Sequence, residues 1–578
     1  MNDISKAPEG KIAGGHMLAR AIKAKGIDRI FALCGGFINP ALIGCQDYDI
    51  DIVAARSEME AGFLATATAR MTREVQVCLA EPSGFTNYVS AVAEAHFAGD
   101  PVIFIGISGN SHNFDNHGFK ELPQAEVVKC MTKYSIEVNE PGRIGWFFDK
   151  AYDIATNQPS GPVQLTIPTN FIFTKQIDAE PPKGARDFDA SRRKIHRPYP
   201  NAEDLKFVET ALQEAKKPAI VAGQGLWSSD AEKDLEEFAA AANIPVFGAF
   251  TYVKAMNQSH PMAMGLLDYY QNTCSRLIGE ECDLLILLGA KLDFPLNFGE
   301  APLINPDTRM ITVNATAREL SDNMLADERI CADLKMFIQC LHKGRNVPAA
   351  DGTWVSRLRQ SRSESVSEYR QFLEQKDGRV HPMRITYDTL MTLGEEDILV
   401  LDGGDIACWG EIAINAWAME GRKVGGIFAP VPWEQMGTGP AFATAMQLAK
   451  PDSRVVLITG DGSLGLAPGF TPMETAIDRG ISVTMVVANN AQWGMIQEQQ
   501  KAMYGRIYAT KLRDVDYYKI FESAGAHAQV VTEADAYLPA LNEAMDTSDP
   551  AFIEVKSMPT PSPVTQGLID MRVRTSIE

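Results

Sequence analysis

Short apolar runs alternate with longer segments of helical period along the whole chain. The first strand-like runs span Arg29–Leu33, Val75–Ala80, Val102–Ile107 and Val163–Ile167, and alanine-rich helical stretches between them span Met59–Met71 and Val89–Phe97. Strands that are apolar throughout fit parallel sheets covered by helices on both faces. The alternation of strands and helices therefore predicts an α/β protein built from doubly wound parallel sheets.

Two polar breaks divide this pattern. Gln176–Pro200 carries four prolines among charged residues, and Lys343–His381 is rich in Arg, Ser and Glu, with one exposed helix expected inside it. Between and after the breaks lie further strand candidates, Ala219–Ala222, Leu284–Leu288 and Met310–Val313, then Ile398–Leu401, Val455–Ile458 and Val483–Ala488. We therefore expect three α/β domains, over residues 1–185, 186–350 and 351–578.

Composition and charge narrow the function classes. The 578 residues include 54 Lys and Arg against 74 Asp and Glu, a net charge of −20. Without a basic surplus, duplex nucleic acid or an anionic membrane is not expected as a partner. No apolar stretch reaches the roughly 18 residues of a spanning helix, and the N-terminus lacks the apolar core of a signal peptide. Nine scattered cysteines indicate reduced thiols and a cytoplasmic protein.

The segment Val455–Met495 places polar residues directly after two apolar strands. Gly460-Asp461-Gly462-Ser463 follows the first strand, and Asn489-Asn490 follows the second. Both strand ends reach the same carboxyl edge of a parallel sheet, so Asp461 and Asn490 can converge. A carboxylate and an amide oxygen suit Mg²⁺, and glycines let the backbone approach a phosphate. The pattern predicts a magnesium–diphosphate site, and two ordinary turns are the alternative.

This segment resembles the diphosphate-binding motif of thiamine diphosphate (ThDP) enzymes, G-D-G-S followed by N-N. The resemblance implies Asp461, Asn490 and the main-chain carbonyl of Gln492 as Mg²⁺ ligands. It also implies cofactor contacts from the neighbouring residues of the two turns, Gly460, Gly462, Ser463, Trp493 and Gly494.

A second match lies about 400 residues upstream, in Ala54–Arg70. Arg56-Ser57-Glu58 is similar to the R-H-E motif of the acetolactate synthase/benzaldehyde lyase group, with Ser57 in place of the histidine. The resemblance implies that Glu58 hydrogen-bonds N1′ of the aminopyrimidine. ThDP acts through a ylide at C2, and an acid near N1′ promotes the imino tautomer that removes the C2 proton. Taken alone, Glu58 is a carboxylate favoured at a helix start.

Two further segments and the central region resemble the same superfamily. Pro432–Ala445 resembles the stretch whose methionine, here Met436, supports the bent cofactor, and Pro82–Asn87 resembles a loop beside the cofactor that includes Gly84 and Asn87. Leu287–Gly299 looks like the central domain of 2-hydroxyacyl-CoA lyase and benzaldehyde lyase. The resemblance implies pyrimidine-binding, central and diphosphate-binding domains. It also implies at least a homodimer, with a homotetramer expected, in which Glu58 serves the cofactor held by the partner's Asp461.

The substrate pocket departs from familiar members. Leu33–Phe37 stands where several relatives carry histidines, and Lys120 replaces a glutamine near the thiazolium. An ammonium there can pair with an anionic substrate, and a solvated loop lysine is the alternative. His112 and His117 in the same loop are candidates for proton transfer, against the alternative of surface histidines.

The shared chemistry of the superfamily is the making or breaking of a C–C bond beside the carbonyl of a small-molecule substrate. We expect a lyase, carboligase or 2-oxoacid decarboxylase similar to acetolactate synthase. Activities similar to those of sulfoacetaldehyde acetyltransferase or 2-hydroxyacyl-CoA lyase are alternatives. A ThDP-binding scaffold without catalysis is a further alternative. These residues do not distinguish whether the central domain holds FAD or ADP.

Overall fold

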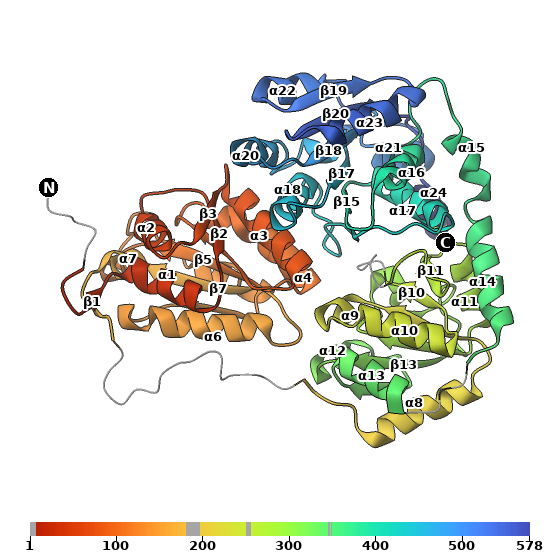
Figure 1. Cartoon of the computed structure of the whole chain (residues 1–578), viewed down its shortest axis with the longest axis horizontal. Coiled ribbons are helices and arrows are strands. Elements are labelled where there is room, and N and C mark those ends of the chain that lie inside the picture. The colour runs from red at the N-terminus through yellow and green to blue at the C-terminus, as the bar shows by residue number, and fades with distance from the viewer. Residues whose placement is uncertain (1–6, 181–196, 250–255, 345–346, 348, 578) are drawn as a thin grey trace. The chain divides into compact units, whose positions relative to one another are not determined.

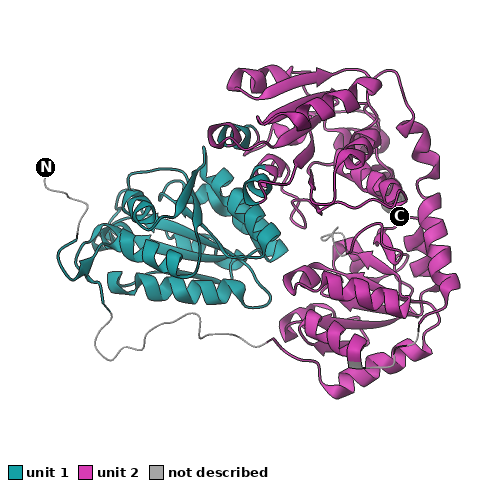
Figure 2. Ribbon diagram, in the orientation of Figure 1, with its two compact units in different colours: residues 1–196, 444–449, 470–475 teal, residues 197–443, 450–469, 476–578 magenta. Residues whose placement is uncertain are grey.

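The computed structural model describes residues 7–180, 197–249, 256–344, 347 and 349–577 (Figure 1). The predicted domain boundary at residues 185 and 186 lies outside the described residues. The chain forms two compact units (Figure 2). The first comprises residues 1–196, 444–449 and 470–475, and the second comprises residues 197–443, 450–469 and 476–578. Within the described residues, no helix combines the length and apolar character needed to span a membrane.

The first unit contains a six-stranded sheet in the order β3-β2-β4-β5-β7-β6. All its strand pairs are parallel. The strands are β2 (Arg29–Ala32), β3 (Asp51–Ala54), β4 (Gln76–Ala80), β5 (Val102–Ser108), β6 (Tyr134–Glu137) and β7 (Val163–Pro168). The main helices are α1 (Gly14–Ala24), α2 (Asn39–Asp47), α3 (Glu58–Thr72), α4 (Val89–Ala98) and α6 (Ile144–Thr156). The strands β4, β5 and β7 are buried along their whole length, as their apolar runs predicted.

The second unit contains two six-stranded parallel sheets, of which the first has the order β11-β10-β9-β12-β13-β14. Its strands are β9 (Pro218–Ala222), β10 (Val246–Gly248), β11 (Ala263–Leu266), β12 (Leu284–Leu288), β13 (Arg309–Asn314) and β14 (Glu328–Cys331). Its helices include α8 (Ala202–Glu214), α9 (Gln224–Ser228), α10 (Glu232–Ala242), α11 (Cys274–Glu281), α12 (Ala317–Asp322) and α13 (Leu334–Gly344).

The other sheet of the second unit has the order β16-β15-β17-β18-β20-β19. Its strands are β15 (Ile398–Leu401), β16 (Gly426–Phe428), β17 (Val455–Gly460), β18 (Thr484–Asn489), β19 (His527–Val531) and β20 (Ala551–Lys556). The helices of this region include α16 (Pro382–Thr392), α17 (Asp405–Ala418), α18 (Gly439–Ala449), α19 (Asp461–Leu464), α20 (Thr471–Arg479), α21 (Gly494–Tyr504), α22 (Tyr517–Ala524), α23 (Tyr537–Asp546) and α24 (Pro563–Ile577).

The first and last sheets share one topology. Counted in chain order within each sheet, their strands lie in the order 2-1-3-4-6-5, whereas the middle sheet has the order 3-2-1-4-5-6. All three are doubly wound, which confirms the predicted fold class. Ligands of such sheets bind at the carboxyl edge, where the strand order reverses. In the first and last sheets that reversal lies between β2 and β4 and between β15 and β17.

The helix predicted in the second polar break is α14 (Gly352–Glu364). It is exposed on one face only, because Trp354, Val355, Leu358 and Arg362 are buried. The indole Nε1 of Trp354 donates to the Pro218 carbonyl at 3.1 Å, and the guanidinium of Arg362 donates to the Ala263 carbonyl at 2.8 Å. This part of the second polar break therefore packs against the sheet that contains β9 and β11. The exact domain boundaries stay a prediction.

Candidate active site

Glu58 occupies a helix start that its neighbours define. The Ser57 hydroxyl accepts a hydrogen bond from the Glu60 N–H at 3.1 Å, and the Glu60 carboxylate accepts one from the Arg56 N–H at 3.0 Å. The arrangement is similar to a capping box, except that Glu60 accepts from the residue before the cap, and it begins α3 after β3. Ser57, the residue that stands in place of the family's histidine, thus caps the helix. Glu58 follows it and is buried, with 8% of its surface exposed.

Three residues predicted for the pyrimidine side of the cofactor lie together. The side-chain amide of Asn87 donates to Oε2 of Glu58 at 2.9 Å. Gly84 lies so close that a Cβ there would stand 1.9 Å from Oε1 of Glu58. Both residues come from the loop after β4, whereas Glu58 follows β3. The carboxyl edge of the first sheet therefore holds one oriented carboxylate beside a glycine that leaves space for it.

Glu81, which the sequence motifs did not mark, pairs with Lys120 on the same edge. The Lys120 ammonium lies 2.9 Å from Oε2 of Glu81, and the Phe37 N–H donates to Oε1 at 2.6 Å. Glu81 follows β4, Lys120 follows β5 and Phe37 follows β2. The sequence signal for Glu81 was its position directly after the apolar run of β4. The spacing in the sequence does not reveal that Lys120 is its partner.

His112 and His117 lie on the loop after β5, and both are exposed. His117 has a left-handed backbone, with φ of 53°. Within the described part of the chain, no hydrogen bond or ion pair joins either imidazole to Glu58, Glu81 or Lys120. The structure thus brings Lys120 into a polar cluster and leaves the two histidines outside it.

Asp461 and Asn490 follow neighbouring parallel strands, as predicted. Gly460 of β17 pairs with Ala488 of β18, so both residues leave the sheet at the same edge. Asp461 is 3% exposed, and its Oδ2 is buried without a hydrogen-bond partner among the described residues. Burial raises the pKa of Asp461 to about 6, although the backbone amides of Asn490 and Gly462 oppose this shift. A buried, unpartnered carboxylate oxygen fits a divalent cation, which would satisfy it.

Two further predicted residues of this edge, Gln492 and Gly494, lie next to Asn490. Its Oδ1 accepts a hydrogen bond from the Gln492 N–H at 3.2 Å. A Cβ on Gly494 would stand 3.4 Å from the Asn490 amide nitrogen, and a Cβ on Gly462 would stand 2.8 Å from the Trp493 ring. A Cβ at residue 462 would therefore clash with the Trp493 ring, whereas a Cβ at residue 494 would make an ordinary contact.

Asp402, a second residue that the motifs missed, ties the loop of Met436 to this edge. Its Oδ2 accepts hydrogen bonds from the N–H groups of Gly437 and Gly439, at 3.2 and 3.1 Å. Its Oδ1 accepts one from the Ser463 hydroxyl at 3.4 Å. Met436, directly before Gly437, is half-buried. The sequence signal that could have identified Asp402 was the D-G-G-D run directly after the apolar strand β15.

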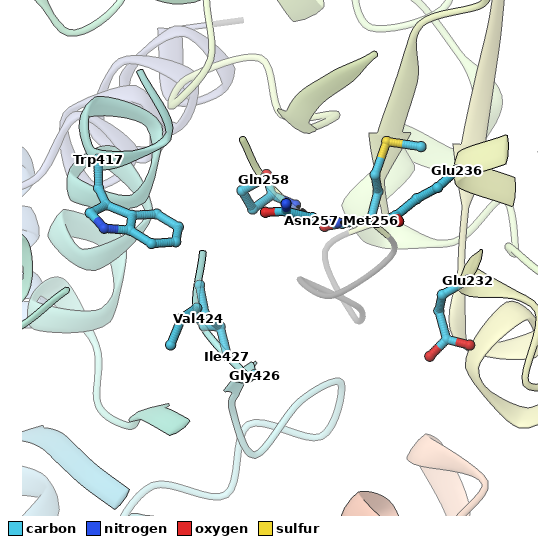
Figure 3. A pocket seen from close by; sticks show the side chains of 9 residues that line it. All are labelled: Glu232, Glu236, Met256, Asn257, Gln258, Trp417, Val424, Gly426 and Ile427. Atoms are coloured by element: carbon cyan, nitrogen blue, oxygen red, sulfur yellow. Dashed lines mark hydrogen bonds between the residues drawn. The ribbon is translucent and has the colours of Figure 1, made fainter. Parts of the chain in front are cut away.

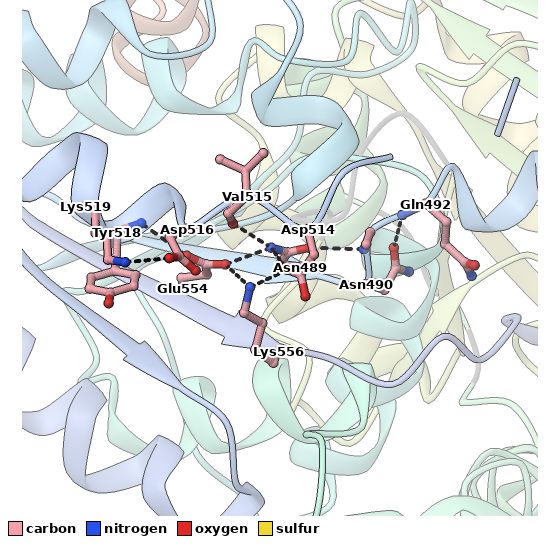
Figure 4. A network of polar contacts seen from close by, with 11 residues as sticks. Asn489, Asn490, Gln492, Asp514, Val515, Asp516, Tyr518, Lys519, Glu554 and Lys556 are labelled. Atoms are coloured by element: carbon pink, nitrogen blue, oxygen red, sulfur yellow. Dashed lines mark hydrogen bonds and ion pairs between the residues drawn. The ribbon is translucent and has the colours of Figure 1, made fainter. Parts of the chain in front are cut away.

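A polar network around Asn489 anchors the loop of Asn490 to the neighbouring strand (Figure 4). The Asn489 side-chain amide donates to Glu554 at 2.7 Å, and its Oδ1 accepts from the Ala491 N–H at 3.0 Å. Lys556 forms ion pairs with both Glu554 and Asp514. The first asparagine of the N-N pair thus anchors the loop to β20, and the second is left at the sheet edge.

Two other findings delimit the site. Among the described residues, no group of three or more His, Cys, Asp or Glu side chains is arranged to hold a metal. The predicted ligand set contains one carboxylate, one amide and one main-chain carbonyl, so it is not such a group.

A separate pocket of the second unit is lined by Glu232, Glu236, Met256, Asn257, Gln258, Trp417, Val424, Gly426 and Ile427 (Figure 3). This lining contains none of the predicted site residues.

Three family models match the chain, each over part of one of the three α/β regions. They describe the N-terminal TPP binding domain, the central domain and the C-terminal TPP binding domain of thiamine pyrophosphate enzymes, at residues 12–127, 205–341 and 410–555. Thiamine pyrophosphate (TPP) is another name for ThDP.

Curated relatives match along nearly the whole chain. A probable acetolactate synthase of Mycobacterium bovis is 26% identical over 562 residues, covering 96% of this chain and 97% of the relative. The 2-hydroxyacyl-CoA lyase 2 of Homo sapiens is 24% identical over 553 residues, covering 90% and 85%. A probable acetolactate synthase large subunit of Methanocaldococcus jannaschii is 25% identical over 556 residues, covering 94% and 91%. The chain therefore belongs to the thiamine pyrophosphate enzyme superfamily and is a ThDP-dependent enzyme of the lyase or carboligase type.

Proposed function

We propose that the protein uses ThDP and Mg²⁺ to make or break a C–C bond next to the carbonyl group of a small substrate. Bound ThDP supplies a nucleophilic carbon, C2, for this chemistry. The observation that carries the proposal is the setting of Glu58. Its carboxylate is buried, oriented by Asn87 and given space by Gly84. In this position Glu58 would hold a proton at N1′ of bound ThDP.

The carboxyl edge of the last sheet holds the diphosphate end in this proposal. Asp461, Asn490 and the carbonyl of Gln492 bind Mg²⁺, because these oxygens are the ligand types that the ion prefers. The backbone around Gly460, Gly462, Ser463, Trp493 and Gly494 lies against the diphosphate, and Met436 supports the ring system. Glu58 completes the cofactor site of a second subunit, so the active form is at least a dimer.

Two reaction types are the strongest candidates. The relatives include proteins named acetolactate synthase and others named 2-hydroxyacyl-CoA lyase, at similar identities of about a quarter. We propose carboligation or decarboxylation of the acetolactate synthase type first. Cleavage of the 2-hydroxyacyl-CoA lyase type is second, favoured by those relatives and by the segment Leu287–Gly299. A sulfoacetaldehyde acetyltransferase-like reaction stays the third alternative.

Calorimetry tests the cofactor assignment. ThDP should bind tightly only with a divalent metal, because the ion neutralises the diphosphate against Asp461. Asp461→Ala should weaken binding at least about tenfold, or roughly 1.4 kcal/mol. The matched control is Asp452→Ala, which removes an exposed carboxylate from the turn before β17 and should leave affinity unchanged. Equal affinity with and without Mg²⁺ would contradict the assignment.

Product analysis tests the reaction. The loaded enzyme is incubated with a panel of 2-oxoacids, aldehydes and acyl-CoAs, and new C–C bonded or cleaved products are identified by mass spectrometry. A protein that binds ThDP but forms no product and does not exchange the C2 proton is a binding scaffold. That result would overturn the proposal.

A further inference from the structure

A buried carboxylate, Asp402, joins three segments at the carboxyl edge of the last sheet. The residue follows β15 and is 1% exposed. Its Oδ2 accepts hydrogen bonds from the N–H groups of Gly437 and Gly439, at the start of α18, and from the Thr459 hydroxyl of β17 at 3.3 Å. Its Oδ1 accepts one from the Ser463 hydroxyl of α19. One side chain therefore holds the start of α18, the end of β17 and α19 together.

These hydrogen bonds take the place of an ion pair. Within the described residues, no Lys, Arg or His side chain pairs with the Asp402 carboxylate, although it is buried. A buried charge is unfavourable unless hydrogen bonds compensate it, and hydrogen bonds to an ionised acceptor are stronger than those between neutral groups. The charge of Asp402 thus strengthens the bonds to three backbone segments, as expected of a side chain that fixes their positions.

Two glycines bring the start of α18 into close contact with Asp402 and α19. A Cβ on Gly439 would stand 2.5 Å from Cβ of Asp402. Gly437 has a left-handed backbone, with φ of 89°, and a Cβ there would stand 2.9 Å from the Ser463 carbonyl oxygen. Both positions require glycine because the neighbouring backbone leaves no space for a side chain. The close approach of these segments is therefore built into the sequence.

The residues that Asp402 binds lie next to predicted cofactor residues. Met436 directly precedes Gly437, and Ser463 belongs to the turn that carries Asp461. Thr459 and Ser463 are fully buried. The separation between the backbone of Met436 and the turn of Asp461 is thus fixed by hydrogen bonds to one carboxylate.

We propose that Asp402 is a positioning residue that fixes the backbone of Met436 against the turn of Asp461 before the cofactor binds. This inference rests on the proposed function, in which Met436 supports the ring system of ThDP and Asp461 holds the diphosphate end. Asp402 acts through the backbone on either side of Thr438. A displacement of about 1 Å can slow a reaction by about 100-fold, so Asp402 governs the reactivity of bound ThDP more than the affinity for its diphosphate.

Hydrogen exchange of the cofactor-free wild-type protein is the first test, and it needs no variant. The amides of Gly437 and Gly439 donate to Asp402, so they should exchange at least about tenfold more slowly than in an unfolded peptide. Peptides that span residues 434–441 report this by mass spectrometry. Free exchange that slows only when ThDP is added would show that the cofactor orders the segment, and would overturn the inference.

Two substitutions separate the position of the side chain from its presence. Asp402→Ala should abolish the protection of the two glycine amides. Asp402→Asn should retain it to within about threefold, because its oxygen can accept from both amides and its nitrogen can donate to the Ser463 hydroxyl. Asp397→Ala is the control, since Asp397 is also buried and accepts backbone hydrogen bonds, but it lies before β15. Equal loss of protection in Asp397→Ala and Asp402→Ala would overturn the inference.

Reactivity and affinity are measured separately in the same variants. At saturating ThDP, exchange of the C2 proton should slow at least about tenfold in Asp402→Ala and about threefold or less in Asp402→Asn. The Kd for magnesium pyrophosphate, which probes the diphosphate end alone, should stay within about threefold of wild type in both. Weaker pyrophosphate binding with normal exchange at saturation would assign Asp402 to diphosphate binding and overturn the inference.

A double-mutant cycle tests whether Asp402 acts through Met436. Met436→Ala should slow C2 exchange, and adding Asp402→Ala should slow it little further. Fully additive effects would contradict the inference. Failure of the wild-type protein to bind ThDP would overturn the proposed function instead. In that case, loss of amide protection in cofactor-free Asp402→Ala would still show that Asp402 fixes this segment.

Discussion

Gly84 and Glu58 approach each other so closely that no side chain fits between them. A Cβ at residue 84 would stand 1.9 Å from Oε1 of Glu58. The backbone of Gly84 has φ of −79° and ψ of −17°, which any L-residue can adopt. Space at the Glu58 carboxylate, and no special backbone conformation, therefore requires the glycine. This relationship makes the orientation of Glu58 testable without changing Glu58 itself.

We expect Gly84→Ala to displace the Glu58 carboxylate. Exchange of the C2 proton of bound ThDP should slow by roughly 10²–10⁴, the usual worth of a positioned proton-transfer group. Gly145→Ala in α6 is the matched control, because a Cβ there meets only the Ala21 methyl at 4.0 Å. NMR of the exchange in both variants is the measurement. Normal exchange in Gly84→Ala would show that Glu58 is not held by this contact.

The ion pair between Lys556 and Glu554, in the network that anchors Asn489, is expected to contribute to the free energy of unfolding. The Lys556 side chain is 13% exposed and pairs with fully buried Glu554 at 2.6 Å. Lys556→Met should cost about 3–5 kcal/mol, because it removes the counter-charge of the buried Glu554 carboxylate, which keeps only the neutral hydrogen bonds from Asn489 and the Tyr518 N–H. Lys519→Met removes an exposed pair with Asp516 from the same region and should cost less than about 1 kcal/mol. Equal losses in a urea titration would contradict this account of the network.

The buried imidazole ring of His381 predicts that the stability of the folded protein depends on pH. It is 1% exposed, and burial lowers its pKa to about 4, while its Nδ1 accepts a hydrogen bond from the Met383 N–H at 3.2 Å. An unfolded histidine has a pKa of about 6.5, so between these values the unfolded state binds more protons. Stability should therefore be complete above pH 6.5 and fall toward pH 4, by about 3 kcal/mol at most.

The comparison with His381→Asn isolates this contribution. Asparagine keeps an acceptor at the start of α16 and does not titrate. Melting temperatures are measured from pH 7 to pH 4 for both proteins. Burial raises the pKa of Asp402 to about 6, so this residue stabilises the protein as the pH falls, opposite to His381. Asp402 is present in both proteins, and the difference between their two curves therefore reports the effect of His381 alone. Parallel curves would assign the pH dependence to other groups.

The fold was predictable where strands are fully buried. Leu284–Leu288 and Ile398–Leu401 were predicted with the bounds of β12 and β15, because a strand covered on both faces must be apolar throughout. Edge strands such as β6 and β14 are partly exposed and carry charged residues, so their pattern resembles a loop. The strand order also could not be predicted, since it depends on which buried strands pair.

The candidate site was predictable where a motif fixes both residue type and spacing. Asp461 and Asn490 leave the sheet at the same edge, as expected. The contacts of Glu58 with Gly84 and Asn87 were not predicted, and the roles of all five residues toward the cofactor stay predictions. Glu81 and Asp402 were missed because their partners, Lys120 and the amides after Met436, arrive from other strands. Proximity of that kind follows from sheet topology and leaves no fixed spacing in the sequence.

Exchange of the C2 proton of bound ThDP is the most direct test of the central claim, that Glu58 activates the cofactor. Glu58→Gln keeps the size of the side chain and removes its acid. We expect ThDP to bind with Mg²⁺ within about tenfold of the wild-type affinity, while exchange slows by roughly 10²–10⁴. Exchange at the wild-type rate in Glu58→Gln would contradict the account.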